Sequence, residues 1–87
     1  MENKELYHVT TPKKAKRYKE SGKIIKPVRG FDTLLAAMYW AMRTGRTVIY
    51  VFQTDKAYKL PDHHNEFGNA YWVDEDVENY KCVVSTN

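Results

Sequence analysis

The stretch VRGFDTLLAAMYWA, residues 28–41, predicts a turn, a helix cap and an apolar helix in succession. Gly30 permits the turn because glycine has no Cβ. Asp32 is expected to cap the first free amides of the helix, and Phe31 to pack back on Ala36 as a hydrophobic staple. Because a helix that is apolar on nearly every side must be buried, we expect this helix to form the centre of the domain.

Two interpretations of this helix stay open. The helix would bring Tyr39 and Trp40 into the middle of a small domain, facing a mouth formed by Arg29, Gly30 and Phe31. That arrangement suits a ligand cleft. It also suits a plain core helix, which is the commoner arrangement in small domains.

A strand and a basic helix are predicted before this stretch. In the strand, Leu6 and His8 are expected on one face, and Tyr7 and Val9 on the other. The helix has clear start and stop signals: a capping threonine, a proline at the first position, and a glycine at the end. These signals are Thr11, Pro12 and Gly22, and the expected inner contacts of the helix are Ala15 and Tyr18.

Short strands and polar connections account for the rest of the chain. The unbroken apolar run at residues 47–52 indicates a strand that is covered on both faces. The expected strands are residues 5–10, 24–25, 47–52, 57–60, 70–73 and 79–85, the helices are 12–21 and 33–44, residues 61–69 are a polar loop, and residues 74–76 are an acidic turn. These elements predict a single α+β domain over residues 1–87, with a small mixed or antiparallel sheet of five or six short strands and two helices.

Composition narrows the class of protein. The chain has 87 residues, of which 14% are aromatic, and one cysteine, Cys82. A chain this short has a thin core, which large aromatic rings partly offset. Cys82 lies in the strand-like run YKCVV, so we expect a small buried core residue and a reducing, cytoplasmic setting. No run is long enough for a membrane helix, and the polar N-terminus is unlike a signal peptide.

The net charge of +3 hides an asymmetry between the two ends of the chain. Residues 1–30 hold nine Lys or Arg against three Glu, whereas residues 61–87 hold one Lys against six acids. The basic end suits the phosphates of a nucleic acid or a nucleotide. Alternatively, it is a solvated helix face that the acidic end neutralises on folding. Its centre is Lys13, Lys14, Lys16, Arg17 and Lys19.

Metal and nucleophile motifs are weak in this sequence. His63 and His64 are adjacent, and neighbouring strand residues point to opposite faces, so the pair converges on one metal only in a bent loop. Asp62, Glu66 and Cys82 add no recognised zinc spacing, and we expect no metal. The sequence has no serine-hydrolase elbow and no phosphate-binding glycine loop, and nothing near Cys82 in the sequence would activate it as a nucleophile.

Four short motifs follow one another along the chain. They are the strand LYHVT at residues 6–10, the turn GFDT at 30–33, the helix motif AAMYWA at 36–41 and the strong strand at 48–52. Their order resembles a reduced ADP-ribosyltransferase-like domain. That fold group includes the toxin and poly-ADP-ribosyl transferases and the RNA 2′-phosphotransferases, and the resemblance extends over most of the chain.

The resemblance implies an NAD site. A first-strand histidine in that family hydrogen-bonds the ribose hydroxyls of NAD, and a helix tyrosine stacks under the nicotinamide; His8 and Tyr39 match them here. Loss of nicotinamide leaves a positive centre that a carboxylate stabilises, and Glu66 is the candidate. The expected cofactor-binding residues are therefore His8, Arg29, Phe31, Thr33 and Tyr39, and the expected catalytic residue is Glu66.

The sequence departs from the family at the late strand. Residues 69–74, NAYWVD, resemble that strand, but Ala70 stands where the family has its glutamate, with Glu66 before it and Glu75 after it. The position of the family's second tyrosine falls near Val28. These departures favour a binding module over an enzyme.

We therefore expect a small, non-catalytic ADP-ribosyltransferase-like domain with a nucleotide-type cleft, which binds a nucleotide or a protein. The alternatives are a minimal NAD-dependent ADP-ribosyltransferase and a basic nucleic-acid-binding protein that uses residues 13–19. If the resemblance holds, His8 and Tyr39 should open into one cleft, and Glu66 should point into it if the protein is an enzyme. Cys82 should be buried and unpaired.

Overall fold

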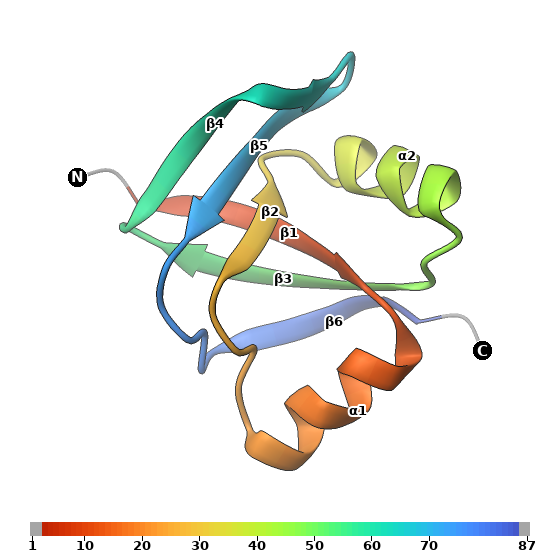
Figure 1. Ribbon diagram of the computed structural model, residues 1–87, viewed down its shortest axis with the longest axis vertical. Coiled ribbons are helices and arrows are strands. Elements are labelled where there is room, and N and C mark those ends of the chain that lie inside the picture. Colours follow the sequence, from red (N-terminus) through yellow and green to blue (C-terminus); the bar gives the residue numbers. More distant parts are fainter. Residues whose placement is uncertain (1–2, 86–87) are drawn as a thin grey trace.

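A six-stranded antiparallel sheet is the frame of the molecule. The computed structural model describes residues 3–85, which form six strands and two helices (Figure 1). In chain order the elements are β1 (Lys4–Thr10), α1 (Pro12–Ser21), β2 (Val28–Phe31), α2 (Leu34–Thr44), β3 (Val48–Thr54), β4 (Ala57–Asn65), β5 (Gly68–Val73) and β6 (Tyr80–Ser85). The spatial order of the strands is β4-β5-β2-β1-β3-β6. The expected α+β class, with an antiparallel sheet and two helices, is confirmed.

The sheet divides into two halves between β2 and β1. Strands β2, β4 and β5 run obliquely across β1, β3 and β6 (Figure 1). β1 pairs with β3 along its whole length, whereas it pairs with β2 in register at Tyr7 and Phe31. A Cβ on Gly30 would lie 2.9 Å from the Cβ of Leu6. Gly30 is therefore not the predicted turn but a strand residue that lets β2 approach β1.

The two helices lie on opposite faces of this sheet. Alternate residues of a strand point to opposite faces, and the predicted division of residues 6–9 between the two faces is confirmed. The α1-side core consists of Leu6, Tyr18, Ile24, Val28, Val48, Tyr50, Phe52, Tyr71, Val73 and Val77. The α2-side core consists of Val9, Phe31, Ala36, Ala37, Ala41, Ile49 and Ala70.

Helix α1 forms as its local signals predict. The Thr11 Oγ1 accepts a hydrogen bond of 3.2 Å from the backbone N–H of Lys14, and Pro12 opens the helix. Gly22 ends it in the left-handed conformation, with φ of 78°, and donates its N–H to the carbonyl of Tyr18 at 2.8 Å. Tyr18 is the buried side chain of this helix, and its other faces are polar.

Helix α2 is capped by a different residue from the predicted one. The Thr33 Oγ1, and not the Asp32 carboxylate, accepts the N–H of Ala36 at 3.0 Å. Asp32 instead accepts the N–H of Asn69 at 2.9 Å, because β5 runs beside this turn. Phe31 and Ala36 belong to the same core, which agrees with the predicted packing of one on the other.

The predicted full burial of α2 is wrong. Its inner face is a stripe of small residues, Ala36, Ala37 and Ala41, which packs on the sheet. On its outer side Leu35 is 56% exposed and Met42 is 82% exposed. No element among the described residues covers that side, so an apolar composition here does not mean a buried helix.

Four further segments differ from the expectation because pairing between strands decides them. Residues 24–25 form only a single bridge, from Ile24 to Val77, whereas residues 28–31 are a strand because β5 pairs along them. The expected polar loop at residues 61–69 is largely the β4–β5 hairpin. Proline is tolerated there because β4 is an edge strand. Cys82 is exposed, contrary to the expectation, because β6 is the other edge strand and most of its residues face solvent.

Candidate functional site

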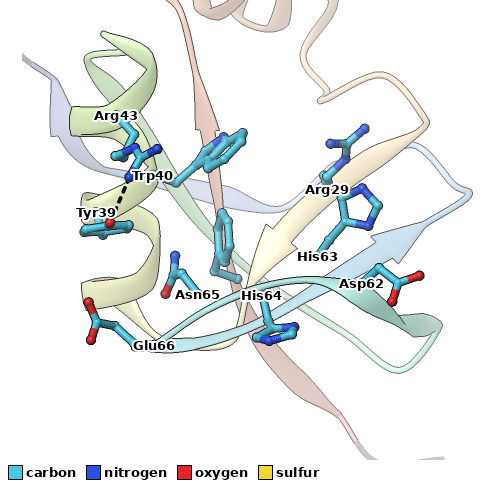
Figure 2. A pocket seen from close by; sticks show the side chains of 10 residues that line it. Arg29, Tyr39, Trp40, Arg43, Asp62, His63, His64, Asn65 and Glu66 are labelled. Atoms are coloured by element: carbon cyan, nitrogen blue, oxygen red, sulfur yellow. Dashed lines mark hydrogen bonds between the residues drawn. The ribbon is translucent and has the colours of Figure 1, made fainter.

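A cleft opens between α2 and the β4–β5 hairpin, on the α2 face of the sheet (Figure 2). Its volume is about 420 Å³, which lies within the range of roughly 300–1,000 Å³ that is typical of small-molecule sites. We call it the α2–β4 cleft. It is lined by Arg29, Phe31, Tyr39, Trp40, Arg43, Asp62, His63, His64, Asn65 and Glu66.

The floor of the cleft comes from β2. Arg29 and Phe31 are two residues apart in the strand, so both side chains leave the sheet on the α2 face. The Phe31 ring packs against Trp40 of α2, with 6.2 Å between ring centroids. The Arg29 guanidinium lies 5.8 Å from the ring of Trp72 on the neighbouring strand β5. A cation and an aromatic surface therefore meet at the base of the cleft.

The helical wall pairs a tyrosine with an arginine one turn later. Residues four apart on a helix are neighbours on its surface, and the Arg43 Nη1 donates to the Tyr39 hydroxyl at 3.1 Å (Figure 2). The same guanidinium carbon lies 5.8 Å from the Tyr39 ring centroid. The bond to Tyr39 uses one of the five donors of Arg43, so the others stay available to an anion.

The hairpin wall is fastened to α2 by side-chain hydrogen bonds. The Asn65 Nδ2 donates to the carbonyl of Ala36 at 3.1 Å, and the Thr33 hydroxyl donates to the carbonyl of Phe67 at 2.8 Å. The Phe67 ring packs against Tyr39, with 5.4 Å between centroids. These contacts set the distance between the two walls of the cleft.

The histidine pair lies on β4 and not in a loop. Figure 2 shows the His63 ring near Arg29 and the His64 ring on the other side of the strand. The two imidazoles therefore do not converge. Within residues 3–85, no group of three His, Cys, Asp or Glu side chains is placed to hold a metal ion.

The charges of the cleft are unevenly compensated. Across the described part of the chain, the ion pairs are Lys23 with Asp76 and Lys56 with Glu75. Neither Arg29 nor Arg43 therefore has an acidic partner there. Asp62 and Glu66 stand on the hairpin side of the cleft, and both are exposed.

His8 lies away from this cleft, on the α1 face of the sheet. It is 9% exposed. Its Nδ1 lies 2.7 Å from the carbonyl oxygen of Arg29, and its Nε2 lies 3.3 Å from the hydroxyl of Tyr18. Because a carbonyl only accepts, Nδ1 carries the proton, and Nε2 accepts from the Tyr18 hydroxyl. Burial lowers the pKa of His8, although the hydrogen bond to Arg29 opposes the shift, which favours the neutral imidazole. Both of its ring nitrogens are engaged in the core.

The structure thus brings together part of the predicted site. Arg29, Phe31, Tyr39 and Glu66 line one cleft. Thr33 does not line it, because its hydroxyl caps α2 and bonds to the hairpin. The expectation that His8 and Tyr39 open into one cleft is contradicted, since the sheet separates them.

The sequence analysis does not assign Arg43, His63 or Asn65 to the cleft. For Arg43 a signal is present in the sequence, since it stands four residues after Tyr39 on a predicted helix. For His63 and Asn65 no signal is present, because a loop at residues 61–69 fixes no direction for its side chains.

No protein-family model, curated protein or solved structure matches this chain. Neither of the two helices between residues 3 and 85 is long and apolar enough to cross a membrane. The function is therefore inferred from the geometry and chemistry of the α2–β4 cleft.

Proposed function

We propose that this chain is a non-catalytic module that binds a nucleotide-type ligand, an aromatic base joined to phosphate, in the α2–β4 cleft. One observation carries the proposal: two guanidinium groups and three aromatic rings surround a single cavity of about 420 Å³. Aromatic faces stack on a base. Guanidinium groups bind phosphate oxygens through two parallel hydrogen bonds.

The arginines are free to take an anion. No described acid forms an ion pair with Arg29 or Arg43. Arg43 is oriented by its bond to Tyr39, and an oriented guanidinium loses less entropy when it binds a phosphate. The Tyr39 and Trp40 rings stand beside it on α2, so base and phosphate would be held by neighbouring groups.

The size of the cleft favours a mononucleotide over a dinucleotide. Its volume of about 420 Å³ lies in the lower part of the small-molecule range, which extends from roughly 300 to 1,000 Å³. A mononucleotide carries one base and one phosphate group, which matches one aromatic wall and one pair of arginines.

The buried histidine favours binding without catalysis. A histidine that is to bind the ribose of NAD needs a free ring nitrogen at the cleft, and both nitrogens of His8 are engaged on the opposite face. In addition, Ala70, at the position where the family has its glutamate, is 1% exposed and packs in the α2-side core.

A ligand titration tests the proposal. Backbone amide resonances of ¹⁵N-labelled protein are followed during additions of AMP, ADP-ribose and NAD. We expect saturable shifts at Gly30, Tyr39 and Asn65, strongest for AMP, with little change at His8. Arg43→Gln and Arg29→Gln should each weaken AMP binding about tenfold or more, since a hydrogen bond to a charged group contributes roughly 1.5–3 kcal/mol.

The matched control is Arg46→Gln. Arg46 stands just beyond α2 and does not line the cleft, so the same change of charge there should leave AMP binding unaltered. Absence of shifts at millimolar nucleotide would overturn the proposal. Equal weakening in all three arginine variants would show a nonspecific effect of net charge and would overturn it as well.

A second candidate function, NAD-dependent ADP-ribosyl transfer, is favoured by one observation: Glu66 lines the same cleft as Tyr39. Release of nicotinamide from NAD separates the two functions. We expect no release above the uncatalysed rate. Release that is abolished by Glu66→Gln and kept by Glu75→Gln would establish the transferase instead.

A further inference from the structure

Helix α1 carries a strongly basic outer surface. Its inward residues are Ala15 and Tyr18, and five of the other eight residues of this ten-residue helix are exposed cations. We call this surface the α1 basic face, and it consists of Lys13, Lys14, Lys16, Arg17 and Lys19. Its neighbour Glu20 is the acid on this helix.

The acidic end of the chain does not neutralise this face. Asp76 pairs with Lys23 at 3.1 Å and accepts the backbone N–H of Lys26 at 2.8 Å, and Glu75 pairs with Lys56 at 3.0 Å. None of the five cations forms an ion pair with an acid among the described residues. The charge asymmetry of the sequence therefore persists as an asymmetry of the folded surface.

Hydrogen bonds of Tyr18 fix α1, and with it these cations, to the rest of the domain. The Tyr18 hydroxyl bonds to the buried His8, and the Tyr18 carbonyl accepts the hydroxyl of Tyr80 at 3.2 Å. At 1.5 Å per residue, α1 is about 15 Å long. A nucleic-acid duplex presents one phosphate for roughly every 1.7 Å of its axis, so a surface of this length faces several phosphates at once.

The α1 basic face offers charge and little else. The aromatic ring of α1, that of Tyr18, points into the core, so it cannot stack on a base. Contacts to phosphate position a protein on nucleic acid but carry no sequence information. Recognition by this face would therefore be independent of sequence.

We propose that the α1 basic face binds the phosphate backbone of a nucleic-acid duplex without reading its sequence. This function goes beyond the nucleotide cleft, because α1 and α2 lie on opposite faces of the sheet. Binding of duplex through lysines and arginines releases counterions, so affinity falls steeply with salt. With about four phosphate contacts, affinity should fall roughly a hundredfold between 50 and 200 mM salt.

Fluorescence anisotropy with labelled 20-base-pair duplexes of arbitrary sequence tests this proposal. The DNA and RNA versions should both bind, because both duplexes present a continuous phosphate backbone. A triple variant, Lys13→Gln, Lys14→Gln and Arg17→Gln, should weaken binding at least tenfold and reduce the slope of log affinity against log salt by about 3.

The matched control is a second triple variant with the same loss of charge elsewhere: Lys56→Gln, Lys59→Gln and Lys81→Gln, all at exposed positions. This control should bind nearly as wild type does, and thermal unfolding should show that both variants stay folded. Equal weakening in the two variants would show that only net charge matters and would overturn the proposal. The proposal also fails if no binding is seen at 50 mM salt, or if vesicles of anionic lipid bind more tightly than duplex and lose binding in the first variant.

Discussion

The two faces of the sheet hold similar side chains and use them differently. Under α1, His8, Tyr18, Tyr50 and Tyr80 form a chain of ring contacts in the core. Above β2, on the other face, Tyr39 and the rings around it line an open cleft beside two arginines. The comparison shows that residue type alone does not locate a site. A histidine or tyrosine can serve a ligand only where its ring or a polar atom is accessible from an open cleft.

The largest expected difference is between two tyrosines, one on each helix. Tyr18→Ala should lower the free energy of unfolding by about 3–5 kcal/mol, as truncation of large buried rings does, because it opens a cavity. It also removes the hydrogen-bond partner of the His8 Nε2. Tyr39→Ala should lower the free energy of unfolding by only about 1 kcal/mol, since the side chain is half-buried, but it should abolish AMP binding.

Urea unfolding of both variants measures this comparison. Tyr18→Phe is the control that keeps the ring and removes the hydroxyl, and it should lose about 1 kcal/mol. Equal destabilisation by the two alanine variants would mean that the cleft wall is part of the core, and the contrast between the two faces would not hold.

Gly68, in the β4–β5 hairpin, tests the same comparison between the two faces of the sheet. A Cβ on Gly68 would lie 2.5 Å from the Asp32 Oδ1 and 3.0 Å from the Ala36 Cβ. Gly68→Ala should therefore push the hairpin away from α2, lower the free energy of unfolding by about 1–3 kcal/mol, and weaken AMP binding through the changed cleft width. Calorimetric AMP titration and thermal unfolding measure the two effects.

The control for Gly68→Ala is Gly22→Ala on the other helix. A Cβ on Gly22 would meet no atom within 4 Å, but the residue has φ of 78°. The substitution should therefore strain the backbone by about 1–2 kcal/mol and leave the cleft unchanged. If both substitutions weaken AMP binding alike, the loss follows from general destabilisation and the hairpin does not set the width of the cleft.

Local signals in the sequence predicted α1 well, and partners distant in the sequence decided what it could not predict. The cap, the first-turn proline and the final glycine of α1 all act within a few residues of the helix. By contrast, residues 28–31 form a strand because β5 pairs with them, and β4 extends past Pro61 because it is an edge strand. Neither fact is visible in local periodicity.

The candidate site could be predicted only in part, again because some of it depends on partners distant in the sequence. Alternation in β1 placed His8 correctly on the face of Leu6. It could not say which helix would cover that face, and this decided that the histidine lies in the core. The cleft is lined by Arg29, Phe31, Tyr39 and Glu66. The first three come from β2 and α2, which follow one another in the sequence, and Glu66 comes from the β4–β5 hairpin that closes on them.

The buried histidine should make stability depend on pH. Its pKa is lowered in the folded state, first by burial and also by the positive charges of Lys14, Arg46 and Arg29. The folded protein therefore binds fewer protons at this site than the unfolded chain does. The stability that this difference provides is fully present above the unfolded pKa of about 6.5 and declines as the pH falls toward the folded pKa. The slope for one proton is at most about 1.4 kcal/mol per pH unit.

Urea unfolding between pH 7.5 and pH 5 measures this slope. Asp76 does not interfere in this range, because the Lys26 amide and the Lys23 ammonium lower its pKa from the ordinary value of 3.8. His8→Asn keeps an amide donor near the Arg29 carbonyl but does not titrate. Its stability should vary less over the same range than that of the wild type. Parallel pH profiles for the two proteins would mean that His8 titrates with the same pKa in the folded and unfolded states, and would contradict its burial as a neutral core residue.

The smallest effect is expected on the outer side of α2, where Met42 is 82% exposed. Met42→Lys should change the free energy of unfolding by no more than about 0.5 kcal/mol, as substitutions at exposed positions usually do. Ala41→Lys, one residue earlier on the inner stripe, should lower it by more, because Ala41 is 8% exposed and packs in the α2-side core. If Met42→Lys instead lowers stability by more than about 1 kcal/mol, and by an amount that rises with protein concentration, the outer side of α2 is covered by a second copy of the chain in solution. The two faces would then differ in what covers their helices, and not only in how their aromatic side chains are used.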